Sequence, residues 1–333
     1  MFTVVQTDAG ASDRLVEDGV FAGSGLEVDF RRCECTSEED LIEHCAGADA
    51  VIPAYAPLSA RVLSELPRCR IVAFMATGYN SVDLAAATAR GILVTHVPDY
   101  CTSEVADHAL GLLLALGRNI GRLHDSVRRG EWDFEAAGKP DRIGRQTLGI
   151  VGLGRIGSAV AARARAFGLR VRAVDPEVDA AAMSTLGVER AELGEVLACD
   201  YVSLHCTLTG ETRGIIDAAA LARMKPTAYL INTARGACVD TEALCAALAA
   251  GSIAGAGLDV VDPEPLPAGH PLRTHPHVIV TPHAAFMSSV AEREGREKAC
   301  SEVVRALRGE VPHYLINLEV LRRPGCRMRP VTA

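Results

Sequence analysis

A short apolar run followed by three regularly spaced glycines, Thr147–Gly157, constrains the fold more than any other part of the chain. The run Thr147–Val151 is typical of a buried parallel strand, and Gly152, Gly154 and Gly157 follow at G-x-G-x-x-G spacing. In such a turn the first glycine permits the tight bend, the second lets a pyrophosphate approach the backbone, and the third lets helix and strand pack closely. The spacing therefore predicts a strand–turn–helix unit whose helix start faces the phosphates of a dinucleotide.

A helix, a second strand and an acidic residue follow in the order that this interpretation requires. Gly168 is a helix stop signal after apolar residues that share one helical face, namely Ile156, Val160, Ala164 and Phe167. The strand candidate Leu169–Val174 ends at Asp175, where the fingerprint places an acid for the adenosine ribose hydroxyls. Because a carboxylate repels a 2′-phosphate, Asp175 favours NAD over NADP. The competing explanation is a glycine-rich turn in some other α/β protein.

Composition narrows the class of protein. At 333 residues the chain has room for about two domains. Hydrophobic residues make up 49%, yet the most apolar stretch, Ala109–Gly117, is bracketed by charged residues and predicts a buried helix rather than a membrane span. The N-terminus lacks the basic region of a signal peptide, so we expect a cytoplasmic protein without membrane partners.

Charge and cysteine content argue against two kinds of binding. The net charge is −8 and no block of basic residues occurs, so nothing favours nucleic acid. The eleven cysteines include no C-x-x-C pair, and Cys33 and Cys35 with His44 and Cys45 do not match a familiar zinc spacing. We therefore expect no metal site and mostly buried thiols in a reducing compartment.

Strand and helix signals alternate along the chain and predict an α/β fold with two Rossmann-like, doubly wound parallel sheets. The helix candidates include Thr102–Leu116 and the amphipathic Ser288–Arg308. Arg296 is among the residues expected on the outer, polar face of the second helix. The predicted strands of the first sheet are Thr3–Thr7, Leu26–Phe30, Ala50–Pro53, Arg70–Phe74 and Ile92–Thr95. Those of the second are Thr147–Val151, Leu169–Val174, Tyr201–His205, Ala228–Asn232, Gly257–Val261 and Val278–Thr281.

Three polar groups follow the late strands, at the sheet edge where open α/β sheets bind ligands. They are Arg235, the acidic loop Asp259–Pro265 and His283. Singly, each is compatible with a surface ion pair or a hydrogen-bonded loop residue. Together they suit hydroxyl/carbonyl redox chemistry: His283 gives or takes the hydroxyl proton, Glu264 fixes its tautomer, and Arg235 holds a carboxylate and polarises the carbonyl.

These motifs resemble the D-isomer-specific 2-hydroxyacid dehydrogenases, a phosphoglycerate dehydrogenase-like family, over nearly the whole chain. Thr281–Phe286 and Val97–Thr102 are most similar to the branch of the C-terminal-binding protein corepressors. The resemblance implies a substrate domain of residues 1–98 and 287–333 around an inserted NAD-binding domain of residues 99–286. It also implies a homodimer packed partly through Thr102–Leu116.

The resemblance also assigns site residues, with Arg235, Glu264 and His283 as the catalytic set. Relatives commonly carry Gly-Val-Gly-x-Asp where this chain has Ala76–Asn80, so the resemblance leaves the substrate open. Tyr55 and Trp132 face either the cleft or, as favoured here, the core. The implied substrate-binding residues are Tyr55, Ala76, Thr77 and Gly78. The implied cofactor-binding residues are Gly152, Gly154, Arg155, Ile156, Gly157, Asp175, Cys206, Thr207, Thr212, Thr233, Ala234 and Asp259.

The sequence therefore predicts an NAD-dependent oxidoreductase that interconverts a 2-keto acid and a D-2-hydroxy acid. Two alternatives stay open at this point. The altered loop Ala76–Asn80 motivates hydride chemistry on a phosphonate- or phosphite-like oxyanion. The similarity to corepressors motivates a non-catalytic, NAD-responsive interaction protein.

Overall fold

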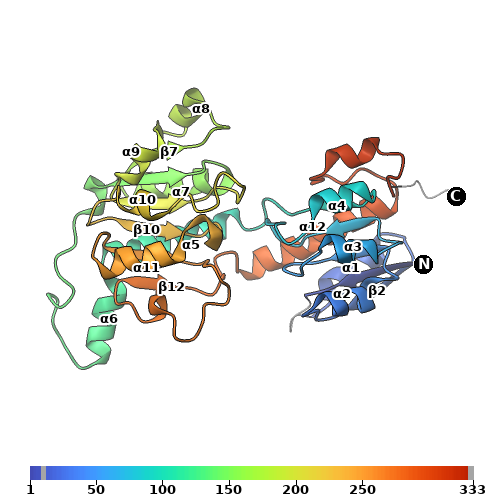
Figure 1. Cartoon of the computed structure of the whole chain (residues 1–333), viewed down its shortest axis with the longest axis horizontal. Coiled ribbons are helices and arrows are strands. Elements are labelled where there is room, and N and C mark those ends of the chain that lie inside the picture. Colours follow the sequence, from blue (N-terminus) through green and yellow to red (C-terminus); the bar gives the residue numbers. More distant parts are fainter. Residues whose placement is uncertain (9–12, 329–333) are drawn as a thin grey trace. The chain divides into compact units, whose positions relative to one another are not determined.

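The computed structural model describes residues 1–8 and 13–328 of the chain. The chain divides into two compact units, and each is described by itself. Unit 1 consists of Met1–Cys101 and Ser288–Ala333, and unit 2 of Thr102–Met287. In Figure 1, the blue elements from the start of the chain accordingly share a unit with the orange-red helix α12 from near its end.

Unit 1 is built on a parallel five-stranded sheet with the order β2-β1-β3-β4-β5. This is the doubly wound flavodoxin-like order, in which β2 is added on one side of β1 and the later strands, from β3 on, are added on the other. The strands are β1 (Phe2–Gln6), β2 (Val28–Arg32), β3 (Ala50–Ile52), β4 (Ile71–Ala73) and β5 (Leu93–Thr95). The helices are α1 (Leu15–Gly23), α2 (Glu38–Cys45), α3 (Ala60–Ser64), α4 (Leu84–Ala89) and α12 (Ser289–Leu307), followed by a 3-10 turn at Leu318–Arg322.

Helices cover both faces of this sheet. Three of them, α2, α3 and α4, close one hydrophobic core over Val5, Val51 and Val72. Each begins at a residue whose side chain accepts a hydrogen bond from the first turn, and these residues are Ser37, Ser59 and Asp83. The remaining two, α1 and α12, contact one another, and α12 also packs against β3, β4 and β5.

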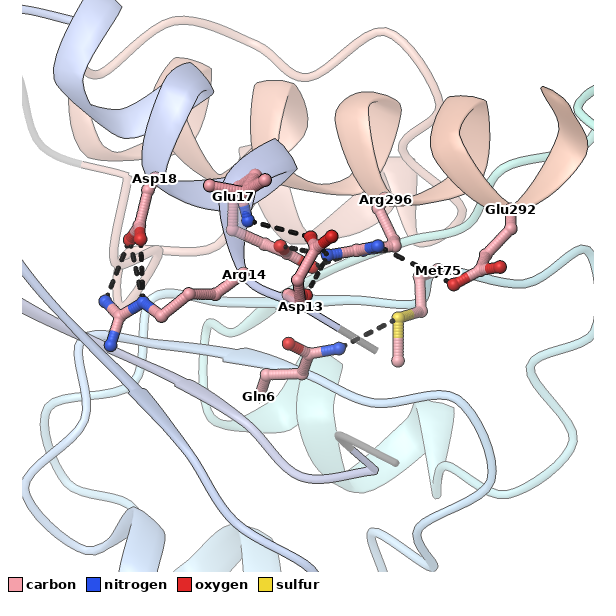
Figure 2. A network of polar contacts seen from close by, with 9 residues as sticks. Gln6, Asp13, Arg14, Glu17, Asp18, Met75, Glu292 and Arg296 are labelled. Atoms are coloured by element: carbon pink, nitrogen blue, oxygen red, sulfur yellow. Dashed lines mark hydrogen bonds and ion pairs between the residues drawn. The ribbon is translucent and has the colours of Figure 1, made fainter. Parts of the chain in front are cut away.

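A buried ion pair ties α1 to α12 (Figure 2). The guanidinium of Arg296 donates to both carboxylate oxygens of Glu17, at 2.7 and 2.6 Å, and also to the carbonyl of Asp13. The side chain of Glu17 is 2% exposed and that of Arg296 is 10% exposed. The prediction that Arg296 lies on the outer face of this helix is therefore wrong, because a carboxylate from the start of the chain meets it inside the unit.

Unit 2 is built on a parallel seven-stranded sheet with the order β12-β11-β10-β9-β6-β7-β8. The reversal lies between β6 and β9, as in dinucleotide-binding folds. The strands are β6 (Thr147–Val151), β7 (Arg170–Val174), β8 (Glu189–Arg190), β9 (Tyr201–Leu204), β10 (Tyr229–Asn232), β11 (Gly255–Leu258) and β12 (Val278–Val280). The helices are α5 (Thr102–Gly117), α6 (Ile120–Arg128), α7 (Arg155–Ala166), α8 (Ala180–Thr185), α9 (Leu193–Leu197), α10 (Ala218–Leu221) and α11 (Thr241–Ala249), with 3-10 turns at Ile143–Arg145, Gly236–Cys238 and Pro271–Arg273.

Two hydrophobic cores flank the second sheet. On one face α5 and α7 pack over β6, β7 and β10, and on the other α9, α10 and α11 pack over β9, β10 and β11. A Cβ added to Gly257 would lie 2.9 Å from Leu112 and 3.2 Å from Leu116, so a glycine in β11 lets α5 approach closely. Helix α5 thus buries its apolar side within its own unit. In the described residues every helix is too short or too polar to cross a bilayer.

The predicted fold class is confirmed, with corrections of detail. The short strand β8 has no counterpart among the predicted strands, and the strand predicted at Gly257–Val261 lies at Gly255–Leu258. The strand ends early because Asp259 begins the following turn. In unit 1 the second strand lies at Val28–Arg32 rather than Leu26–Phe30.

Candidate functional site

The glycine turn of unit 2 has the geometry that its spacing predicts. Gly152 has φ of 91°, and a Cβ there would lie 2.6 Å from the backbone nitrogen of Cys206, so no other residue fits without strain. A Cβ on Gly157 would lie 2.2 Å from the carbonyl oxygen of Gly152, which explains the close contact between helix and turn. The turn joins β6 to α7 where the strand order reverses, with Cys206 just after the neighbouring strand β9.

The residues around this turn fit a dinucleotide. Gly154 is the N-cap of the 12-residue helix α7, makes no side-chain cap hydrogen bond, and has no atom within 4 Å of an added Cβ. The first N–H groups of α7, starting at Arg155 and Ile156, are thus oriented to receive a phosphate. Thr233, at the end of β10, has a buried hydroxyl with no partner among the described residues. An unsatisfied buried polar atom at this edge is the kind of group that a ligand satisfies.

Asp175 lies at the end of β7, directly beside the turn. Its carboxylate accepts hydrogen bonds from the N–H groups of Leu153, at 2.6 Å, and Glu177, at 2.8 Å. Arg172, the nearest arginine on the same strand, instead pairs with Glu189 at 3.1 Å. The ionisable side chain that β7 presents to the turn is therefore the carboxylate of Asp175.

His283 and Glu264 form a hydrogen-bonded pair at the same edge of the sheet. The distance from His283 Nδ1 to Glu264 Oε2 is 2.9 Å, and Glu264 Oε1 accepts from the N–H of Val261 at 2.9 Å. Burial alone would raise the pKa of Glu264, but hydrogen bonds from His283 and Val261 and the charges of His283 and Arg235 hold that pKa below its ordinary value. A carboxylate that stays charged keeps the Nδ1 proton in place and leaves Nε2 for chemistry.

The backbone of His283 is held in an unusual conformation. Its φ is 53°, in the left-handed region that few side-chain-bearing residues adopt. Buried Asp259 holds this turn, because its Oδ1 accepts from the N–H of Ala284 and its Oδ2 from the N–H of Ala285, both at 2.9 Å. The backbone N–H of His283 also donates to the carbonyl of Asp259 at 2.8 Å.

Arg235 is positioned by a second strand-end residue. The side chain of Asn232, 1% exposed, donates to the carbonyl of Arg235 and accepts from the N–H of Ala234. The half-buried guanidinium of Arg235 donates to the carbonyl of Ala234 at 2.6 Å. A Cβ on Gly236 would lie 1.9 Å from the carbonyl oxygen of Val261, so this glycine lets the loop of Arg235 lie against the loop that carries Glu264.

The other residues predicted to line the cofactor include Cys206, Thr207, Thr212 and Asp259, and they make different contacts. The neighbouring thiol of Cys238, together with burial, raises the pKa of the Cys206 thiol. The hydroxyl of Thr212 donates to the carbonyl of exposed Thr207 at 2.6 Å. Both carboxylate oxygens of Asp259 are used by the turn that carries His283. Among the described residues, no group of three or more His, Cys, Asp and Glu side chains is arranged to hold a metal ion.

The predicted substrate residues belong to unit 1. Tyr55 follows β3, and the loop of Ala76, Thr77 and Gly78 follows β4, at the carboxyl ends of parallel strands. The carbonyl of Ala76 accepts from the N–H of Val97, and the hydroxyl of Thr77 donates to the carbonyl of Val97 at 3.1 Å.

Two side chains with a predicted place in the core are exposed instead. Tyr55 is 58% exposed and Trp132 is 91% exposed. Packing is therefore the wrong role for both, because each lies on a loop outside the hydrophobic cores.

Three polar residues of this region had no predicted role. Asn232 is a polar residue at the end of an apolar strand, and this position in the sequence could have identified it as a site residue. His205 follows β9, with its Nε2 at 2.8 Å from the hydroxyl of Ser203 and its buried Nδ1 without a partner in the described chain. His108 lies on α5, with Nε2 at 2.9 Å from the hydroxyl of Thr281, and nothing in the sequence pattern predicts that contact.

Comparisons with known proteins agree with this geometry. A family model described as D-isomer specific 2-hydroxyacid dehydrogenase, NAD binding domain, matches residues 110–285. The chain is 42% identical to a glyoxylate reductase of Korarchaeum cryptofilum, covering 90% of this chain and 93% of that protein. It is 38% identical to a D-3-phosphoglycerate dehydrogenase of Mycobacterium leprae, covering 92% of this chain but 58% of that protein. A solved structure of D-lactate dehydrogenase from Aquifex aeolicus, complexed with NAD and lactic acid, matches with a TM-score of 0.83 at 29% identity, covering 92% of this chain and 96% of that one.

The matches confirm the resemblance that the motifs predicted. They give no support to a phosphite-like substrate or to a corepressor-like interaction protein. The chain belongs to the D-isomer specific 2-hydroxyacid dehydrogenase family and is an NAD-dependent oxidoreductase of 2-hydroxy and 2-keto acids.

Proposed function

We propose that this enzyme reduces small 2-keto acids, with glyoxylate as the first candidate, to the corresponding 2-hydroxy acids. The glyoxylate reductase named above is matched over 93% of its length, whereas the phosphoglycerate dehydrogenase has much additional chain. A small substrate without a phosphate group also suits the overall negative charge of the protein. The same residues catalyse the reverse oxidation.

The His283–Glu264 pair, at 2.9 Å, is the observation that carries this proposal. Bound NADH supplies the hydride for the carbonyl carbon. His283 donates the Nε2 proton of its imidazolium to the carbonyl oxygen, and Glu264 stabilises the charged ring and fixes its orientation. In the oxidation direction, neutral His283 accepts the hydroxyl proton.

Arg235 holds the substrate carboxylate through its guanidinium N–H donors and polarises the carbonyl. Unit 1 acts as the substrate domain, in which the backbone of Ala76, Thr77 and Gly78 and the exposed ring of Tyr55 contact the substrate. Exposure of Tyr55 and the tethering of the loop to Val97 support this role.

Unit 2 acts as the NAD-binding domain. The glycine turn, the start of α7 and Asp175 contact the NAD. The negative charge of Asp175 favours NAD over NADP. The further cofactor-lining residues are Cys206, Thr207, Thr212, Thr233 and Ala234. Asp259 contributes to the cofactor site by holding the turn that carries His283.

We also propose a homodimer in the cytoplasm. In Figure 1, α6 and the segment after it project from the body of unit 2. This region exposes large apolar side chains, at Ile120 (55%), Val127 (48%), Trp132 (91%) and Phe134 (86%), whereas the apolar side of α5 is covered by its own unit. Light scattering should give the mass of two chains, and the mass of one chain would contradict the dimer. The eleven cysteines, all free thiols, suit a reducing compartment.

Turnover of NADH with a panel of carbonyl compounds tests the function. Glyoxylate, pyruvate and hydroxypyruvate are compared with glycolaldehyde, which lacks the carboxylate, and with a phosphonate analogue. We expect kcat/KM for at least one 2-keto acid to exceed that for glycolaldehyde by ~10² or more. Glycolaldehyde offers Arg235 no carboxylate to bind, whereas each 2-keto acid does. Tight NADH binding without turnover of any 2-keto acid would overturn the proposal.

A further inference from the structure

We propose that His108, on helix α5, is a positioning residue that holds the turn of His283 in its active conformation. The inference rests on the proposed function, in which His283 is the proton donor. It adds a residue that lies on a different element and does not itself reach the reacting atoms.

A chain of short polar contacts runs from α5 to this turn. His108 Nε2 lies 2.9 Å from Thr281 Oγ1, and Thr281 Oγ1 lies 2.5 Å from Asp259 Oδ1. Asp259 Oδ1 also accepts from the N–H of Ala284, the residue after His283, at 2.9 Å. The side chain of Asp259 is 1% exposed and that of His108 is 26% exposed.

The chemistry of the three groups fixes the direction of these hydrogen bonds. An ionised carboxylate only accepts, so the single hydroxyl proton of Thr281 points to Asp259. The Thr281 oxygen must therefore accept from His108, and His108 carries its proton on Nε2. His108 thus orients Thr281, and Thr281 orients the carboxylate.

The orientation of this carboxylate decides the placement of His283. Because φ of His283 is 53°, the turn needs external support, and Asp259 supplies it through both oxygens and its backbone carbonyl. Loss of the Thr281 contact frees the carboxylate to rotate and displaces the imidazole. A displacement of about 1 Å at a reacting group can lower a rate by up to about 10².

Helix α5 is a firm base for such support. His108 lies one helical turn before Leu112, the side chain that packs against Gly257 in β11. The strand that ends just before Asp259 and the helix that carries His108 are therefore locked together by the core of unit 2.

The matched control for His108 is its neighbour Asp107. The carboxylate of Asp107 is 64% exposed and pairs with Arg163 at 2.6 Å, away from the turn. The variants are His108→Leu, which removes the donor, His108→Gln, whose amide can still donate to Thr281, and Asp107→Asn. Each is assayed with NADH and the best 2-keto acid, alongside NADH binding and melting temperature.

We expect His108→Leu to lower kcat about tenfold while KM for the keto acid and Kd for NADH change less than about threefold. His108→Gln should recover kcat to within about threefold of the wild type, and Asp107→Asn should match the wild type. A structural role alone predicts a lower melting temperature with unchanged kcat. That result, or failure of His108→Gln to restore kcat in a folded protein, would overturn the inference.

A second readout does not depend on turnover. In the spectrum of ¹⁵N-histidine-labelled protein, with His283→Asn identifying the ring signals, His108→Leu should shift the resonances of His283 and Asp107→Asn should not. Unshifted resonances would overturn the inference. An inactive wild type with shifted resonances would instead reject the proposed function and retain the link between His108 and His283.

Discussion

Two buried side chains at strand ends, Asn232 and Asp259, hold the turns that carry the proposed catalytic residues Arg235 and His283. Asn232 bonds the turn that carries Arg235, and Asp259 bonds the turn that carries His283. Each side chain satisfies backbone groups that would otherwise be buried without partners. The backbone beside each proposed catalytic residue is thus held by the buried side chain of another residue.

Another strand-end residue, His205, should make the stability of the protein depend on pH. Burial lowers the pKa of His205 to about 4, whereas an unfolded histidine titrates near about 6.5. The unfolded chain therefore takes up the proton first, so the contribution of this group to stability is complete above about pH 6.5 and is lost as the pH falls towards 4. Between about pH 6.5 and 5 the loss amounts to roughly 2 kcal/mol.

The variant His205→Gln should abolish this part of the pH dependence. Its amide can still bond Ser203, but it takes up no proton. Urea unfolding at pH 7 and pH 5 should show a smaller decline in the free energy of unfolding than for the wild type. His44→Gln, at an exposed position of α2, is the control. Equal declines in wild type and His205→Gln would rule out the buried neutral imidazole.

At the scale of elements, the pair of Glu17 and Arg296 should hold α12 against α1 (Figure 2). Removing one partner of a buried pair leaves an uncompensated charge, so Glu17→Gln should lower the free energy of unfolding by about 3 kcal/mol. Asp18→Asn, which breaks the exposed pair between α1 and its N-cap residue Arg14, should cost less than about 1 kcal/mol. Similar losses for both variants in urea unfolding would contradict the buried role.

The elements with a strong apolar pattern could be predicted, and those without one could not. The strands that begin at Thr147 and Tyr201 are largely buried, and their predicted ends agree with the structure to within one residue. The strand β8, by contrast, consists of exposed Glu189 and Arg190, whose pairing with β7 has no local signal. The burial of Arg296 depends on Glu17, 279 residues away in the chain, which helical periodicity cannot represent.

At the scale of the whole molecule, the chain makes unit 1 from its two ends and unit 2 from its middle. The glycine turn, Arg235, Glu264 and His283 all belong to unit 2, which the rule for carboxyl strand ends predicted from the order of the strands. The same rule did not reveal His108, because a contact between a helix and a turn depends on packing rather than on position along the sheet. The proposed substrate residues belong to unit 1, so the proposed substrate residues and the proposed catalytic residues belong to different compact units.

The measurement that tests the account most directly is the turnover of His283→Asn. General acid–base catalysis contributes about 10² to 10⁴, so we expect kcat for the best 2-keto acid to fall by about 10³. Kd for NADH should stay within about threefold of the wild type and the melting temperature should not change, while His313→Asn, at an exposed position, should behave as wild type. A His283→Asn enzyme that turns over at the wild-type rate would contradict the assignment of His283 as the proton donor.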